Sequence, residues 1–103
     1  MAELVRRATQ GDQQAWNGLV DRFAATVWAI ARAHRLNEAS AADVSQTTWL
    51  RLVEHLDTIK QPERVGAWLA TTARRESLRV LRVSARQVPT GEDFNVLADP
   101  APP

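Results

Sequence analysis

Apolar residues recur at every third or fourth position through three long stretches of the chain, residues 12–34, 40–56 and 63–84. This spacing places them on one side of a helix, and it predicts three amphipathic helices that each have one side to bury. A shorter stretch at residues 3–9 predicts a first helix, which Gly11 would end. Strand signals, which alternate at every second residue, are nearly absent. The pattern therefore predicts an all-α fold, a compact bundle of three to four helices.

The ends of these helices carry their own signals. Asp12 suits the N-cap of the second helix, and a capping box of the form S-x-x-D begins at Ser40 for the third helix. Pro62 disfavours helical geometry in the residue before it, so residues 57–62 are predicted to form a loop before the fourth helix. Gly66 should weaken the first turn of that helix by about 1 kcal/mol relative to alanine.

Composition sets the domain organisation. The chain has 103 residues, 45% hydrophobic and 24% charged, enough for one small domain that we expect to span residues 1–86. Four of the five prolines and three acidic residues fall within residues 87–103, a composition typical of a disordered linker or tail. Cysteine is absent, and His34 and His55 lie alone on separate helical patterns, so no metal site and no cofactor are predicted. No signal or membrane-spanning segment is visible, and a cytoplasmic location is expected.

The third predicted helix has two different sides. One is apolar and is expected to face the core, with Val44, Thr48, Trp49, Leu52 and Leu56. The other mixes a carboxylate, an amide, a hydroxyl and a leucine, in Asp43, Gln46, Thr47 and Leu50. An apolar anchor among directional polar groups is typical of a helix-binding interface, but the same spacing also fits a plain solvated surface.

The fourth predicted helix carries a row of arginines beside its apolar side. Arg75, Arg79, Arg82 and Arg86 are spaced four, three and four residues apart, which aligns them along one edge. Such a row is self-repelling unless anions lie along it, and phosphates are the obvious candidate. The alternative is a solvated helix face with ordinary ion pairs, for which Glu76 is an available partner.

Three segments in this order resemble a known family. They are ATQGDQQAWNGLVDRFAATVWAIA, DVSQTTWLRLVEHL and, after a short loop, GAWLATTARRESLRVLR. Together they resemble conserved region 2 of the sigma-70 family of bacterial transcription initiation factors, most closely that of the extracytoplasmic-function (ECF) group. The resemblance covers residues 3 to about 86. It implies a non-enzymatic protein whose partners are the RNA polymerase core and promoter DNA, with an anti-sigma factor as a further partner that the sequence does not identify.

The resemblance assigns roles to both surfaces. Asp43, Gln46 and Leu50, with Thr47 between them, match the positions that bind the clamp helices of the polymerase beta-prime subunit. The loop at 57–64 matches the segment that receives a base flipped out of the minus-ten element. We expect that loop and the fourth helix to contact the non-template strand through Lys60, Gln61, Arg64, Arg74, Arg75, Arg79 and Arg82. Trp68 matches a paired Trp-Leu position and is interpreted as mainly a core residue.

This sequence departs from the family pattern at three points. Thr47 stands where an acidic residue is usual, so part of the clamp contact is expected to differ. Arg75 stands where asparagine is common, which favours phosphate contact over inherited base reading. Residues 1–103 also hold no match to the family's second, helix-turn-helix domain, which reads the minus-thirty-five element. We therefore expect either an isolated domain or a shortened protein, without full initiation activity.

Two rival interpretations remain open. In the first, the chain is a helical protein–protein interaction module whose arginine row docks an acidic partner. In the second, it binds double-stranded DNA as a helix-turn-helix protein, although the loop containing Pro62 is longer than the tight turn of that motif. An enzyme is the least expected class, because no catalytic constellation is visible.

Overall fold

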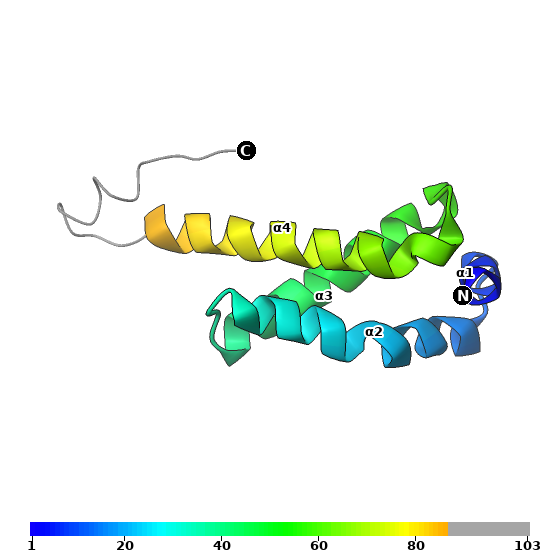
Figure 1. Cartoon of the computed structure of the whole chain (residues 1–103), viewed down its shortest axis with the longest axis horizontal. Coiled ribbons are helices and arrows are strands. Elements are labelled where there is room, and N and C mark those ends of the chain that lie inside the picture. Colours follow the sequence, from blue (N-terminus) through cyan, green and yellow to red (C-terminus); the bar gives the residue numbers. More distant parts are fainter. Residues whose placement is uncertain (87–103) are drawn as a thin grey trace.

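The chain folds into a bundle of helices (Figure 1). The computed structural model describes residues 1–86, so the predicted linker at 87–103 lies outside the described residues. The elements in chain order are α1 (Ala2–Thr9), α2 (Gln13–Ala33), α3 (Glu38–His55), the 3-10 turns η1 (Leu56–Thr58) and η2 (Pro62–Arg64), and α4 (Val65–Arg86). The prediction of an all-α fold with three to four helices is confirmed.

The three long helices pack against one another lengthwise. In Figure 1, α2 and α4 run in the same direction and α3 runs back between their ends, while α1 is seen almost end-on beside the start of α4. Each pair among α2, α3 and α4 is in contact, and α1 contacts α2, η1 and η2. The loop that follows α3 is therefore held between the beginning of α4 and the short α1. None of the helices within residues 1–86 combines the length and apolarity needed to cross a membrane.

The core follows the predicted apolar sides. The main cluster joins all four helices and contains Val5, Leu19, Val27, Leu52, Leu56, Val65, Leu69 and Ala73. A second, smaller cluster lies where α2 turns into α3, with Ala31, Leu36, Ala41 and Val44. Two hydroxyl groups that are fully buried are satisfied within their own helices: Thr48 donates to the carbonyl of Val44 and Ser77 to that of Ala73, both at 2.8 Å. Burial of these residues fixes which sides of α3 and α4 remain outside.

Two predicted helix starts differ from the structure. The third helix begins at Glu38, not at Ser40, and its N-cap is Asn37, whose side-chain oxygen accepts a hydrogen bond from the Ser40 amide at 2.8 Å. Asparagine caps a helix as well as serine does, so the earlier cap prevails and adds most of a turn. The fourth α-helix begins at Val65, because the 3-10 turn η2 precedes it.

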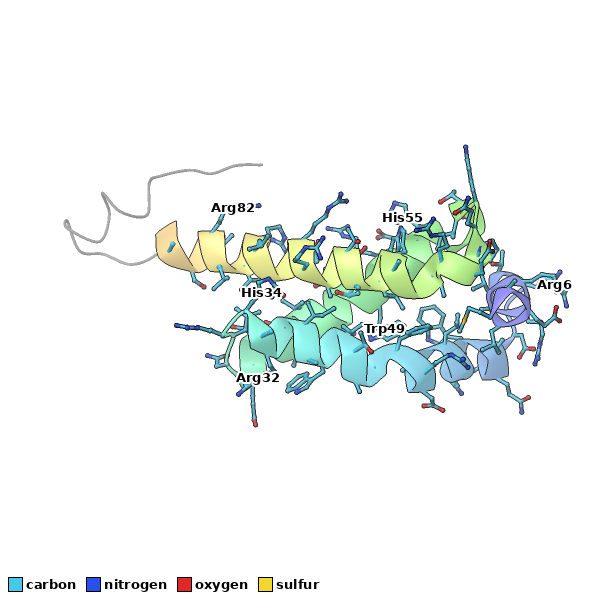
Figure 2. The ribbon with its side chains drawn as sticks, in the orientation of Figure 1. Arg6, Arg32, His34, Trp49, His55 and Arg82 are labelled. Carbon is cyan, nitrogen blue, oxygen red and sulfur yellow. The ribbon has the colours of Figure 1, made fainter. Side chains whose placement is uncertain are left out.

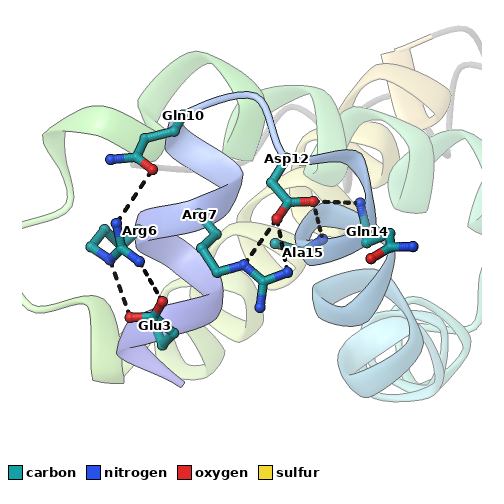
Figure 3. Close-up of polar contacts among 7 residues, drawn as sticks. All are labelled: Glu3, Arg6, Arg7, Gln10, Asp12, Gln14 and Ala15. Atoms are coloured by element: carbon teal, nitrogen blue, oxygen red, sulfur yellow. Dashed lines mark hydrogen bonds and ion pairs between the residues drawn. The ribbon is translucent and has the colours of Figure 1, made fainter.

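Asp12 caps α2 as predicted and also holds α1 in place (Figure 3). Its carboxylate accepts hydrogen bonds from the backbone amides of Gln14 and Ala15, at 3.0 and 3.3 Å, and from the guanidinium of Arg7, at 2.9 Å. The Arg7 hydrogen bond, followed by that of the Ala15 amide, lowers the pKa of Asp12 below its ordinary value. The backbone reverses direction beside Asp12, at Gly11, where φ is 91°. The hydrogen bond between Arg7 and Asp12 therefore joins α1 to the start of α2.

We expect the Asp12 carboxylate to make the free energy of unfolding depend on pH in the acid range. Its pKa is lower in the folded chain than in the unfolded chain, so its contribution is complete above about pH 4 and is lost as the pH falls through the folded value. Asp12→Asn should therefore flatten the acid limb of the unfolding free energy measured by urea titration between pH 7 and 2.5. Asp21→Asn, a change at an exposed position of the same helix, should leave that limb as it is in the parent chain. Equal acid sensitivity in the parent and Asp12→Asn would contradict the assignment.

Candidate polymerase and nucleic-acid interfaces

The outer side of α3 is polar and has one prominent leucine. Asp43 and Gln46 are exposed, Leu50 is 54% exposed, and Thr47 is half-buried. They share this side because the opposite side of α3, with Leu52 and its neighbours, is buried in the core. We call these four residues the α3 patch. Its polar groups and its apolar centre are all accessible to a partner helix.

Val53 extends the α3 patch beyond the residues that the sequence pattern indicated. It is 57% exposed and lies three residues after Leu50, on the same side of the helix. It also borders a hollow of about 460 Å³, together with Glu54 of α3 and Trp16 of α2. The i+3 spacing of the two apolar residues is a signal in the sequence that could have identified Val53.

A second hollow, of about 450 Å³, lies between the end of α3, the following loop and the start of α4. Three of the predicted DNA-contacting residues, Lys60, Gln61 and Arg64, line it together. Arg64 donates to the side-chain oxygen of Gln61 at 3.5 Å, which leaves the Gln61 NH₂ group unused by that bond. The hollow thus combines two cations and an amide donor, and we call it the loop hollow.

Trp68 forms a shared wall between the loop hollow and a third hollow. The third hollow, of about 350 Å³, continues along α4 and is lined by Arg64, Trp68 and Arg75, among others. The half-buried indole of Trp68 also packs against the main core cluster, as expected for a mainly structural residue. One aromatic side chain therefore has both a core contact and a surface accessible from the hollows.

The arginine row begins beside this third hollow and follows α4. Successive residues turn by about 100°, so Arg75, Arg79 and Arg82 fall within roughly 60° of one another. All three are exposed, and Arg82 projects from the side of α4 that faces away from α2 (Figure 2). Arg74 is also exposed, but the same geometry places it about 100° from Arg75, off the row. The side chain of Arg86 lies outside the described residues.

Arg79 is engaged within the fold, as the ion-pair alternative anticipated. Its Nε donates to Oε1 of Glu76 at 3.0 Å, and the other carboxylate oxygen of Glu76 lies 3.6 Å from Nε of Arg51 on α3. Glu76 is only 8% exposed, so its charge is sheltered from water and needs these two partners. Among the described members of the row, Arg75 and Arg82 therefore have more freedom to bind an external anion.

His55 is a member of the loop hollow that the sequence did not indicate. It was predicted to be an ordinary helix-face residue, and it is exposed at the end of α3. Its imidazole also lines the loop hollow, with its ring centre 5.9 Å from that of Trp68 on α4. The two residues are thirteen positions apart and lie on different helices. The spacing of residues within α3 therefore could not predict that His55 contacts α4.

The chain is similar in sequence to known proteins. The model of the sigma-70 region 2 family matches residues 19–87, which contain α3, the loop hollow and the arginine row. A similar protein is the ECF RNA polymerase sigma factor BldN of Streptomyces coelicolor, which is 36% identical over 75 residues, 72% of this chain and 28% of that protein. The match thus spans less than a third of the length of that relative. These matches confirm the resemblance to the ECF group, and the chain belongs to the sigma-70 region 2 family.

Proposed function

We propose that this domain recognises the minus-ten element of promoters as region 2 of an ECF-type sigma factor. In this role it binds the clamp helices of the RNA polymerase beta-prime subunit and holds the non-template DNA strand as the duplex opens. The observation that carries the proposal is the loop hollow, where Lys60, Gln61 and Arg64 surround an aromatic wall at the head of an arginine row.

The loop hollow suits an unpaired base. A base can be read along its Watson–Crick edge only after it leaves the stack, which costs a few kcal/mol. Contact with an aromatic surface such as Trp68 returns about 1–3 kcal/mol per base, and the Gln61 amide can hydrogen-bond to a base edge. Lys60 and Arg64 add the positive charge that the flanking phosphates require. The hollow therefore offers shape, stacking and charge at one place.

The α3 patch supplies the second half of the function. A coiled coil presents side chains at helical spacing, and the exposed Leu50 can anchor it while Asp43 and Gln46 supply directional polar contacts. Docking through α3 leaves the side chains of the loop hollow and of the arginine row free for DNA, because none of them belongs to the α3 patch. Polymerase binding and strand binding can then occur together.

The proposal is tested with the two partners separately. The isolated beta-prime clamp coiled coil should be retained by the immobilised domain, and a fluorescent minus-ten non-template strand should bind more tightly than a scrambled strand of the same length. Equal affinity for both strands, together with no retention of the coiled coil, would favour the interaction module with an acidic partner instead.

Variants of the arginine row should separate strand contacts from general charge. Arg75→Ala and Arg82→Ala should each weaken binding to single strands of any sequence, and each should reduce the slope of log K against log salt by about 0.7. Arg79→Ala should have a smaller effect because Glu76 already holds that guanidinium. Arg32→Ala is the matched control, because Arg32 is an exposed arginine on α2, on the opposite side of the molecule from Arg82 in Figure 2. A loss for Arg32→Ala as large as that for Arg75→Ala would refute a localised strand contact.

A further inference from the structure

The tautomer of His55 is set by the fold. Its Nδ1 lies 2.9 Å from the carbonyl oxygen of Arg51, one turn earlier in α3. A carbonyl oxygen only accepts hydrogen bonds, so Nδ1 must carry the hydrogen. In the neutral ring, Nε2 is then a bare acceptor, and on protonation it becomes a donor while the Nδ1 bond persists unchanged. Nε2 is therefore the ring nitrogen that changes from hydrogen-bond acceptor to donor when the ring is protonated.

That ring lies on a wall of the loop hollow that also holds two permanent cations. Lys60 and Arg64 line the same hollow, and Trp68 lies against the imidazole. The ring is exposed at the end of α3 in Figure 2, on the same side of the molecule as Arg82. A phosphate bound here would therefore meet the imidazole as well as the lysine and the arginine.

The other charged groups around His55 do not supply it with an acid partner. On α3, Arg51 and Glu54 pair with each other at 3.5 Å. Asp57 of η1 lines the 460 Å³ hollow beside Val53 and does not line the loop hollow. Glu63 of η2 is exposed. None of the ion pairs formed within residues 1–86 involves His55. Lys60 and Arg64 are the charged residues that line the loop hollow together with His55.

We propose that His55 is a further DNA-contacting residue and that strand binding at the loop hollow takes up one proton. On binding, a proton from solvent adds to Nε2, and Nε2–H donates to a phosphate oxygen of the strand beside Lys60 and Arg64. This inference rests on the proposed function, since it requires that single-stranded DNA occupies the loop hollow. Its consequence is tighter strand binding at lower pH within the range in which histidine titrates.

The test is an anisotropy titration of a ten-nucleotide oligodeoxythymidine that carries a rhodamine label, at constant salt, at pH 6 and pH 8. Thymine and the backbone phosphates keep their charge in this range, so a proton taken up on binding must be held by the protein. Uptake of one proton should make binding roughly three- to tenfold tighter at pH 6 than at pH 8. The salt slope should also be steeper at pH 6 by about 0.7.

Two histidine variants make the test specific. His55→Gln should abolish the difference between pH 6 and pH 8. His34→Gln should retain it, because His34 bonds in the same way to a carbonyl one turn earlier, that of Ile30 at 2.8 Å, but lies at the end of α2. Circular dichroism at both pH values checks that each variant is folded.

The outcomes separate this inference from the proposed function. If the parent chain binds the oligonucleotide through Arg75 but shows equal affinity at both pH values, or if His55→Gln keeps the difference, the role of His55 is refuted and the proposed function stands. If the parent chain fails to bind the oligonucleotide at either pH, the role of His55 is refuted together with the strand-binding half of the proposed function, and the contact of the α3 patch with polymerase is tested by retention of the coiled coil.

Discussion

Replacing Leu50 by aspartate should weaken binding of the domain to the beta-prime clamp coiled coil by 30-fold or more. Leu50 is 54% exposed at the centre of the α3 patch, and an apolar anchor of this kind contributes about 2 kcal/mol or more to a helix interface. Aspartate would remove the apolar contact and add a charge that the interface must desolvate. Asp43→Ala and Gln46→Ala should weaken binding less, because each removes one polar contact. Surface plasmon resonance with immobilised coiled coil measures all three.

Leu78→Asp is the matched control for this change. Leu78 is 43% exposed on α4, so the same substitution alters the surface of the domain without touching the α3 patch. It should bind the coiled coil with the affinity of the parent chain. If Leu50→Asp binds normally, or if both variants lose affinity equally, the α3 patch is not the polymerase contact.

Replacing Gly66 by alanine should lower the free energy of unfolding by about 1–3 kcal/mol, the usual effect of overpacking. A Cβ atom at this position would lie 2.8 Å from Cε1 of the Phe23 ring on α2. Phe23 is partly buried against the main core cluster, so its ring cannot move away freely. The strain should outweigh the gain of up to about 1 kcal/mol that alanine brings to a helix. Urea unfolding followed by circular dichroism measures the difference.

Gly18→Ala provides the comparison, since Gly18 also lies within a helix. There the added Cβ would lie 3.4 Å from Cδ2 of Leu4, close to an ordinary contact with the flexible end of a side chain. This variant should be as stable as the parent or more stable. Stabilisation by both alanines would show that α2 and α4 do not need the close approach at Gly66.

The sequence predicts the fold well because the bundle is built on helical periodicity. The apolar side of α4 is an example: Val65, Leu69 and Ala73 recur at four-residue spacing, and all are buried. Boundaries are less predictable, because two good caps competed before α3 and the spacing alone could not rank Asn37 against Ser40. Gly66 was interpreted as a weak point in a helix, whereas its contact with Phe23 shows a packing role that only the position of α2 reveals.

The candidate site is predictable in part, for the same reason. The exposure of Asp43, Gln46 and Leu50 follows from the burial of the opposite side of α3, and the arginine row follows from helical spacing. The contact of His55 with Trp68 and the approach of Arg51 to Glu76 join different helices, so local pattern contains no trace of them.

Glu76 has a consequence for how the domain responds to ionic strength. A nearly enclosed carboxylate that joins guanidinium groups of α3 and α4 is poorly reached by dissolved ions, whereas Arg75 and Arg82 stand in open water. Added electrolyte should therefore detach DNA long before it loosens the junction between the two helices. Nucleic acid carried through purification can be washed off in concentrated salt, and the recovered domain should keep its native architecture.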